Sequence, residues 1–255
     1  MTTCKLVVKG IDYISHQAAL GSVTRSINNP LLTNEVNISG FLNILTAAKD
    51  EYSVRRMVYA ASSSTYGDSP VLPKTENIIG KPLSPYAVTK LVNEIYADVF
   101  SKVYGFHTIG LRYFNVFGPN QSPDNPYAAV IPLFMKAAVE GKRPIIFGDG
   151  ETSRDFTFIE NVVQANIKAL LLRDISEPII CNIAFGDQIT LNNLWRLILD
   201  SLFISNIQPA YKPARIGDIK HSLADIGKAK DVFGYLPRYS VKAGIEWLCR
   251  FNNGV

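Results

Sequence analysis

The apolar residues of this chain recur at two spacings, which divide it into alternating strands and helices. Short apolar runs predict buried strands at residues 11–15, 56–61, 108–113, 144–147, 155–159 and 179–183. Apolar residues three and four positions apart predict helices at residues 33–49, 86–104, 130–140, 161–172, 191–201, 226–233 and 241–251. Strands that alternate with helices are typical of a doubly wound parallel sheet, so we expect an α/β fold.

The order of the predicted elements changes after Gly118 and Pro119. We therefore expect residues 1–118 to form the sheet domain and residues 119–255 to form a smaller α/β domain. A chain of 255 residues that is 47% hydrophobic is long enough to bury a core in each of them.

A tyrosine, a lysine and a run of serines indicate proton-transfer chemistry. Tyr86 and Lys90 lie four residues apart in the predicted helix 86–104, so their side chains share one face. An ammonium beside a phenol favours the phenolate and lowers the pKa of the tyrosine. The serines at 62–64 follow the predicted strand 56–61, at the end where parallel sheets bind ligands. Taken alone, the Tyr-x-x-x-Lys spacing also fits a half-buried tyrosine and a solvated lysine on an amphipathic helix.

Composition narrows the class of protein. The net charge of +4 is small and the basic residues are scattered, so we expect no nucleic-acid surface. Cys4, Cys181 and Cys249 lie far apart without metal-ligand spacing, which favours reduced thiols in the cytoplasm and no metal site. No apolar run approaches the roughly 18 residues of a membrane span and no leader pattern is present, so we expect no membrane association.

Three motifs resemble the extended short-chain dehydrogenase/reductase family. They are Ala-Ala-Ser-Ser-Ser-Thr-Tyr-Gly at 60–67, Ser-Pro-Tyr-Ala-Val-Thr-Lys at 84–90 and Leu-Arg-Tyr-Phe-Asn-Val-Phe-Gly-Pro at 111–119. Further motifs at 16–23, 148–156 and 217–225 make the chain similar to bacterial UDP-N-acetylglucosamine 4-epimerases of surface-polysaccharide pathways. The resemblance implies a Rossmann-like sheet domain and a substrate domain with interleaved segments. It also implies NAD-dependent epimerisation at C4 of a UDP-sugar through a transient 4-keto sugar.

The same resemblance implies catalytic and cofactor-binding roles. Tyr86 would act as the general base, Lys90 would favour its phenolate, and Ser62 would supply a hydroxyl to the reacting oxygen. The residues implied to lie along NAD are His16, Ala18, Ala19, Asn37, Tyr86, Lys90 and Tyr113.

A second set of residues is implied to hold the UDP-sugar. Arg154 and Arg215 would bracket the diphosphate, because guanidinium groups match phosphate oxygens. Asp218 would accept a hydrogen bond from a ribose hydroxyl. The other residues implied to contact the phosphates, the uracil or the sugar are Gly21, Ser63, Ser64, Asn115, Ala129, Val130, Phe147 and Ser222.

Two positions bear on the reaction and on the sugar. The 4,6-dehydratases of this family carry an Asp-Glu pair where this chain has Ser-Ser-Ser-Thr at 62–65, so epimerisation is favoured over elimination. Strict UDP-galactose epimerases have a bulky aromatic residue at the position of Ser222. A serine there, with Gly21 on the facing loop, favours a UDP-N-acetylhexosamine or its uronic acid form. UDP-glucuronate and UDP-glucose 4-epimerase stay open as alternatives.

The chain has no G-x-x-G-x-x-G motif, which seats the NAD pyrophosphate at a helix N-terminus in this family. Compared with the family, roughly 80–90 residues would precede the first predicted strand, more than one βαβ unit. We therefore expect the 255-residue polypeptide alone to bind NAD weakly; the alternative is an inactive form that acts only by association. The family's dimer helices correspond to 33–49 and 86–104, so a homodimer is implied.

Overall fold

The structure is a computed structural model that describes residues 1–125, 128–173, 175–205, 207–214 and 220–252. The chain forms two compact units whose segments alternate along the sequence. Unit 1 comprises Met1–Tyr113, Val163–Ile183 and Asp225–Tyr235, and unit 2 comprises Phe114–Val162, Ala184–Ala224 and Leu236–Val255.

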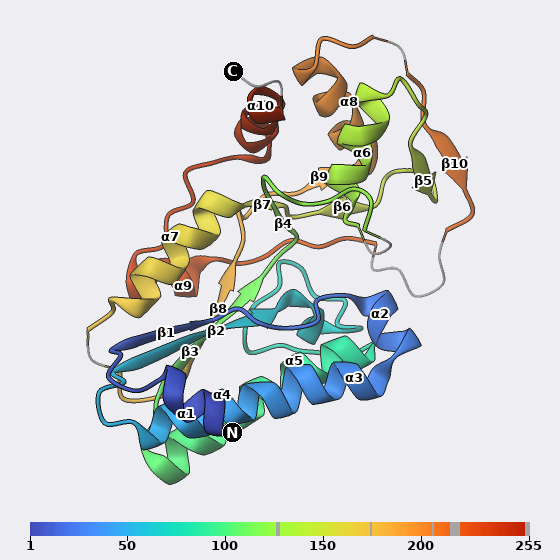
Figure 1. The fold of residues 1–255 in the computed structure, drawn as a ribbon. Coiled ribbons are helices and arrows are strands. Elements are labelled where there is room, and N and C mark those ends of the chain that lie inside the picture. The colour runs from blue at the N-terminus through green and yellow to red at the C-terminus, as the bar shows by residue number, and fades with distance from the viewer. Residues whose placement is uncertain (126–127, 174, 206, 215–219, 253–255) are drawn as a thin grey trace. The chain divides into compact units, whose positions relative to one another are not determined.

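Unit 1 contains a four-stranded parallel sheet in the order β1-β2-β3-β8 (Figure 1). The strands are β1 Tyr13–His16, β2 Arg56–Ser62, β3 Thr108–Tyr113 and β8 Ile179–Ile183. The middle strands β2 and β3 are buried along almost their whole length, which explains their continuous apolar sequence. The predicted parallel sheet is confirmed.

Helices lie on both faces of this sheet, with α1, α4 and α5 on one face and α7 and α9 on the other (Figure 1). The helical elements, of which α7 begins in unit 2, are α1 Thr2–Val7, α2 Val23–Asn28, α3 Pro30–Asn34, π-helical η1 Glu35–Ser39, α4 Gly40–Asp50, 3-10 η2 Ser63–Tyr66, α5 Pro85–Tyr104, α7 Ile159–Leu170 and α9 Gly227–Phe233. The sequence pattern did not predict α1 and α2, because six residues carry less than two turns of periodicity.

Unit 2 combines short strand pairs with three longer helices. The pairs are β4 Val116–Phe117 with β7 Thr157–Phe158, β5 Ile145–Phe147 with β10 Ala210–Lys212, and β6 Ser153–Arg154 with β9 Ile189–Thr190. The helices are α6 Val130–Val139, α8 Leu191–Ser201 and α10 Val241–Asn252. The strand predicted at 155–159 forms only at Thr157–Phe158, as β7. Asp155, whose side chain is fully buried, lies between β6 and β7 and belongs to neither.

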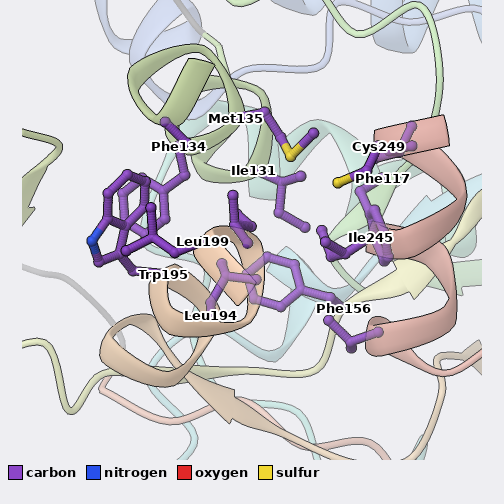
Figure 2. Close-up of a cluster of buried hydrophobic side chains, with 14 of the residues drawn as sticks. Phe117, Ile131, Phe134, Met135, Phe156, Leu194, Trp195, Leu199, Ile245 and Cys249 are labelled. Atoms are coloured by element: carbon purple, nitrogen blue, oxygen red, sulfur yellow. The ribbon is translucent and has the colours of Figure 1, made fainter. Parts of the chain in front are cut away.

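The core of unit 2 is apolar and rich in aromatic rings (Figure 2). The rings of Phe134 on α6 and Trp195 on α8 meet edge to face, with centroids 5.5 Å apart. The indole of Trp195 donates a hydrogen bond to the carbonyl of Ile207 at 2.8 Å. Side chains from α6, α8, α10 and the strands therefore form one packed cluster that supports the pocket described below.

Two kinds of feature are absent from the part of the chain that the structure describes. None of its helices is both long and apolar enough to cross a membrane. Its His, Cys, Asp and Glu side chains form no group that could hold a metal ion.

Candidate active site

The carboxyl edge of the parallel sheet in unit 1 brings together residues that are distant in sequence. The pairing register sets His16 of β1 beside Tyr59 of β2, and Ser62 of β2 beside Tyr113 of β3. Because parallel strands share a direction, the polar residues at their ends meet at one edge, where sheets of this type bind ligands.

Tyr86 and Lys90 lie in the first two turns of α5. The helix starts at this point because the hydroxyl of Ser84 accepts a hydrogen bond from the N–H of Ala87 and Pro85 occupies the first turn. Lys90 Nζ donates to the carbonyl of Ala60 at 2.6 Å and lies 6.0 Å from the ring centroid of Tyr86. The two side chains share one helix face and meet the end of β2.

The pKa of Tyr86 differs from the sequence-based expectation of a lowered value. Burial raises the pKa of Tyr86, and a hydrogen bond with Ser62 opposes this rise. Burial also lowers the pKa of Lys90 to about 8, and the charge of Glu94 opposes that fall. Burying a phenol disfavours its charged form, and this effect outweighs the hydrogen bond with Ser62.

Ser62 is oriented to donate its hydroxyl hydrogen. Its Oγ accepts hydrogen bonds from the N–H and the hydroxyl of Ser64, at 3.2 and 2.9 Å. With two donors already bound to its oxygen, the hydroxyl of Ser62 can donate its own hydrogen to another oxygen, such as that of Tyr86. Ser63, the first residue of η2, is half-buried.

The loop after β1 carries three more of the predicted residues. Ala18 and Gly21 are exposed and Ala19 is half-buried. A Cβ on Gly21 would meet nothing within 4 Å, so the loop leaves open space there. His16 packs against the ring of Phe41, with ring centroids 5.6 Å apart. Burial and the charge of Lys90 lower the pKa of His16 to about 4, so this imidazole is neutral at pH 7.

Asn37 occupies the centre of the π-helical turn η1, and its side chain is engaged within the protein. Its Oδ1 accepts from the N–H of Leu20 at 2.8 Å, and its Nδ2 donates to the carbonyl of Leu20 and to the hydroxyl of Thr89. Thr89 in turn donates to the carbonyl of Tyr86 at 2.8 Å. The Asn37 amide thus ties the loop after β1 to the first turn of α5.

The hydroxyl of Tyr113 belongs to a network that sequence reasoning did not identify. It donates to Gln17 at 3.0 Å and exchanges hydrogen bonds with the amide of Asn166. Gln17 and Asn166 are 149 positions apart and also bond to each other, so no local sequence signal could have indicated them. Burial raises the pKa of Tyr113.

In unit 2, a pocket of about 650 Å³ gathers five residues of the predicted substrate set. They are Asn115, Ala129, Val130, Phe147 and Arg154, contributed by separate segments. The pocket has the volume typical of a small-molecule site. Several aromatic residues of the cluster in Figure 2 also line it.

Strand β6 connects Arg154 with the segment that carries Ser222. The N–H of Ser222 donates to the carbonyl of Ser153 at 3.1 Å. The guanidinium of Arg154 bonds the carbonyls of Ser153 and Lys220. Ser222 is half-buried. The predicted residues Arg215 and Asp218 lie outside the described residues.

Asp155 is a functional-site neighbour that the sequence did not indicate. Its carboxylate accepts backbone N–H groups from Phe185, Gly186 and Ala224, at 3.1–3.2 Å. Its carbonyl accepts from the amide of Asn115 at 2.9 Å. The side chain of Asp155 thus holds two segments and its main-chain carbonyl holds a third. Its position beside Arg154 in the sequence was the available signal.

Comparison with known proteins identifies the family. The pattern of the NAD dependent epimerase/dehydratase family matches residues 2–184, more than half of the chain. The chain belongs to this family.

Members of this epimerase family with different substrates are similar to the chain. It is 34% identical over 243 residues to a putative UDP-glucose 4-epimerase of Methanocaldococcus jannaschii, covering 95% of this chain and 77% of the relative. A solved UDP-N-acetylglucosamine 4-epimerase of Methanobrevibacter ruminantium, in complex with UDP-N-acetylmuramic acid, is 37% identical with a TM-score of 0.92, over 99% of this chain and 80% of that one. A UDP-glucuronic acid 4-epimerase of Bacillus cereus, solved with UDP-glucuronic acid and NAD, is 27% identical with a TM-score of 0.89, over 98% and 78%.

The residues at the sheet edge fit the nicotinamide half of the family's cofactor. Tyr86 and Lys90 provide a hydroxyl and an ammonium, which are the donors that ribose hydroxyls require. The neutral imidazole of His16 adds no positive charge that would repel a nicotinamide cation. Tyr86 and Lys90 are therefore chemically suited to hold the nicotinamide ribose of NAD.

Proposed function

We propose that this protein is an NAD-dependent 4-epimerase of UDP-sugars and that its preferred substrate is a UDP-N-acetylhexosamine. The observation that carries the proposal is the meeting of Ser62, Tyr86 and Lys90 at the carboxyl edge of a parallel sheet. A phenol, a hydroxyl and an ammonium at this edge supply what removal and return of an alcohol proton require.

In this mechanism Tyr86 takes the proton of the sugar 4-hydroxyl, and Ser62 donates a hydrogen bond to the same oxygen. A bound NAD would supply the acceptor and the donor for the C4 hydride, and return of the hydride to the other face of the 4-keto sugar would give the epimer. Lys90 favours the phenolate of Tyr86, whose pKa is otherwise raised by burial. Tyr86 finally returns the proton to the oxygen. The residues of this chain thus move the proton of the 4-hydroxyl, whereas the hydride transfer would depend on NAD.

Elimination is disfavoured by the chemistry of the loop after β2. Loss of a 6-hydroxyl group needs an acid and a base beside C5 and C6. Residues 62–65 offer hydroxyl groups and no carboxylate. Because residues 62–65 lack such an acid and base, we infer epimerisation without dehydration.

The pocket of unit 2 is proposed to hold UDP. Arg154 would bind a phosphate, because a guanidinium makes paired hydrogen bonds to phosphate oxygens. Ala129, Val130 and Phe147 would enclose the uracil, and Asn115 would bond a phosphate or the sugar. UDP titration by calorimetry tests this without NAD. We expect Arg154→Gln to weaken UDP binding by roughly 10- to 100-fold, the value of a charged hydrogen bond, and the exposed control Arg196→Gln to leave it unchanged.

The choice of sugar rests on Ser222 and Gly21. Each of them is small, and a Cβ on Gly21 would meet nothing within 4 Å, so neither residue would exclude an acetamide group at C2 as a bulky aromatic residue would. Conversion of UDP-N-acetylglucosamine, UDP-glucose and UDP-glucuronate, each incubated with saturating NAD, tests the choice by chromatography. Faster conversion of UDP-glucose or UDP-glucuronate would replace the proposed substrate with that alternative. Binding of NAD without conversion of any sugar would favour a role in association only.

A homodimer through α5 and the run from α3 to α4 is also proposed. The outward face of α5 is apolar, with Val88, Ile95 and Val99 between 42% and 54% exposed. A second copy of the same face would cover these side chains. We expect Ile95→Glu to shift sedimentation from dimer to monomer. Val139→Glu, at a 67% exposed valine on α6, is the matched control and should leave the dimer intact.

A further inference from the structure

A buried ion pair lies in unit 1, one helical turn beyond Lys90. Nε and Nη2 of Arg112 donate to the two carboxylate oxygens of Glu94, at 2.9 and 2.7 Å. The side chains of Arg112 and Glu94 are 4% and 8% exposed. Burying two charges is unfavourable, and an apolar pair of similar size often stabilises a fold equally well. Stability alone therefore does not account for the pair.

The contacts of Arg112 hold the Glu94 carboxylate in one position. Nη1 of Arg112 donates to the carbonyl of Glu76 at 3.0 Å, and its Cζ lies 4.9 Å from the ring centroid of Tyr66. The Tyr66 hydroxyl donates to Asn182 at 2.6 Å. Because the Arg112 guanidinium is held by these contacts at both ends and on its planar face, it fixes the position of the Glu94 carboxylate. Glu94 lies on the same face of α5 as Lys90.

The titratable and charged groups that act on Lys90 come from two elements. Tyr86 and Glu94 lie on α5, and His16 lies on β1. Glu94 in turn interacts with Arg112 on β3 and with Tyr59 on β2. The imidazole of His16 is neutral because its pKa is lowered to about 4, and burial raises the pKa of Tyr59 well above its usual value. Among these groups, Glu94 supplies the negative charge at neutral pH.

We propose that Glu94, held by Arg112, is a positioning residue that keeps the amine of Lys90 protonated beside Tyr86. Burial favours a neutral lysine, and a carboxylate one turn away opposes this effect. A neutral amine would still donate to the carbonyl of Ala60, but it would no longer favour the phenolate of Tyr86. The inference rests on the proposed proton transfer by Tyr86.

The test is the titration of Lys90, followed by NMR of the 13Cε signals of lysine in the full chain. Loss of one signal in Lys90→Arg assigns the resonance. We expect Glu94→Gln to lower the titration midpoint of Lys90 by about one pH unit, the order of a charge one turn away at a partly screened site. Arg112→Lys, which disturbs the same buried pair but retains the Glu94 charge, should leave the midpoint within about 0.3 units.

Two further variants separate charge from packing. Asp98→Asn removes a carboxylate from the exposed side of α5, where Asp98 binds Lys102 at 2.6 Å, and should leave Lys90 unchanged. Glu94→Asp keeps the charge but moves it away, so we expect a smaller fall in the midpoint. Glu94→Asp also provides the test of the inference if Glu94→Gln does not fold. Unchanged midpoints in the folded Glu94 variants, or equal falls in Glu94→Gln and Arg112→Lys, would overturn the inference.

The titration does not depend on turnover, so its failure is distinct from failure of the proposed function. If the titration midpoint of Lys90 falls in Glu94→Gln but the protein converts no UDP-sugar, the proposed function is wrong and the role of Glu94 stands. In an active protein, the alkaline fall of kcat should begin about one pH unit lower in Glu94→Gln, with KM unchanged. A merely structural role would not move this pH profile.

Discussion

Helices α5 and α8 present opposite kinds of side chain to the interior of their units. Helix α8 buries Leu194, Trp195, Ile198 and Leu199, as an amphipathic helix on an apolar core does. Helix α5 buries a set that is mainly polar, namely Ala87, Thr89, Lys90, Asn93, Glu94, Ala97, Phe100 and Ser101. Its exposed positions include Val88, Ile95 and Val99.

The difference separates packing from chemistry. The buried face of α8 needs only shape and apolar area, so its pattern is the one that stability alone produces. The buried face of α5 places an ammonium and a carboxylate where they must be compensated by Ala60 and Arg112. Several of its larger apolar residues, Val88, Ile95 and Val99, lie on the outer face, where a second subunit is proposed to cover them.

The strongest test of the polar face is Tyr86→Phe, which removes only the phenol oxygen. We expect kcat to fall by about 10²- to 10⁴-fold, the contribution typical of a general base, with UDP-sugar affinity retained. Turnover assays and calorimetric titration of the UDP-sugar measure the two effects. Turnover close to that of the wild type would remove Tyr86 from the mechanism.

A matched pair of isoleucines tests the comparison of the helices directly. Ile198 on α8 is fully buried, whereas Ile95 on α5 is 54% exposed. We expect Ile198→Ala to lower the free energy of unfolding by about 2–5 kcal/mol. Ile95→Ala should change it by less than about 0.5 kcal/mol at concentrations where the protein is monomeric. Urea unfolding checks both, and equal losses would contradict the reversed burial of α5.

A bulky substitution at position 222 tests the proposal that unit 2 determines which sugar is accepted. Ser222→Tyr should suppress turnover of UDP-N-acetylglucosamine roughly tenfold or more, because overpacking costs about 1–3 kcal/mol. Turnover of UDP-glucose should persist or improve. A parallel fall for both substrates would mean that the tyrosine disturbs β6 and Arg154 and does not act on the acetamide.

Asp155 is an exception to the apolar interior of unit 2, and its expected effect is spread over several pH units. Burial raises the pKa of Asp155 to about 7, although three N–H groups act in the opposite direction. The folded state then binds one more proton than the unfolded state between about pH 4 and 7. Stability should therefore fall as pH rises through this window, by at most about 1.4 kcal/mol per pH unit.

Urea midpoints measured between pH 4 and 8 check this dependence. The variant Asp155→Asn, which cannot titrate, should lose this part of the slope. An identical pH dependence in the variant and the wild type would show that Asp155 is already ionised at low pH and that the N–H groups outweigh its burial.

Local sequence determined most of the helices and the strands of the sheet. Strand β3 and helix α8 have the predicted bounds, and α5 begins one residue early, because apolar periodicity and the cap at Ser84 are local properties. The spacing of Tyr86 and Lys90, the pair proposed to act in proton transfer, is likewise a property of one helix. The gathering of Ser62 at the same edge could be predicted because parallel strands share a direction.

Only the tertiary structure decided which polar groups are compensated and which charges remain. The raised pKa of Tyr86 comes from burial by elements distant in sequence, so the lowered value predicted from Lys90 alone did not hold. The partners of Tyr113 and Asp155 likewise come from other segments. Apolar periodicity describes which residues avoid water, but a hydrogen bond or a pKa depends on atoms that the folded chain brings within a few ångströms.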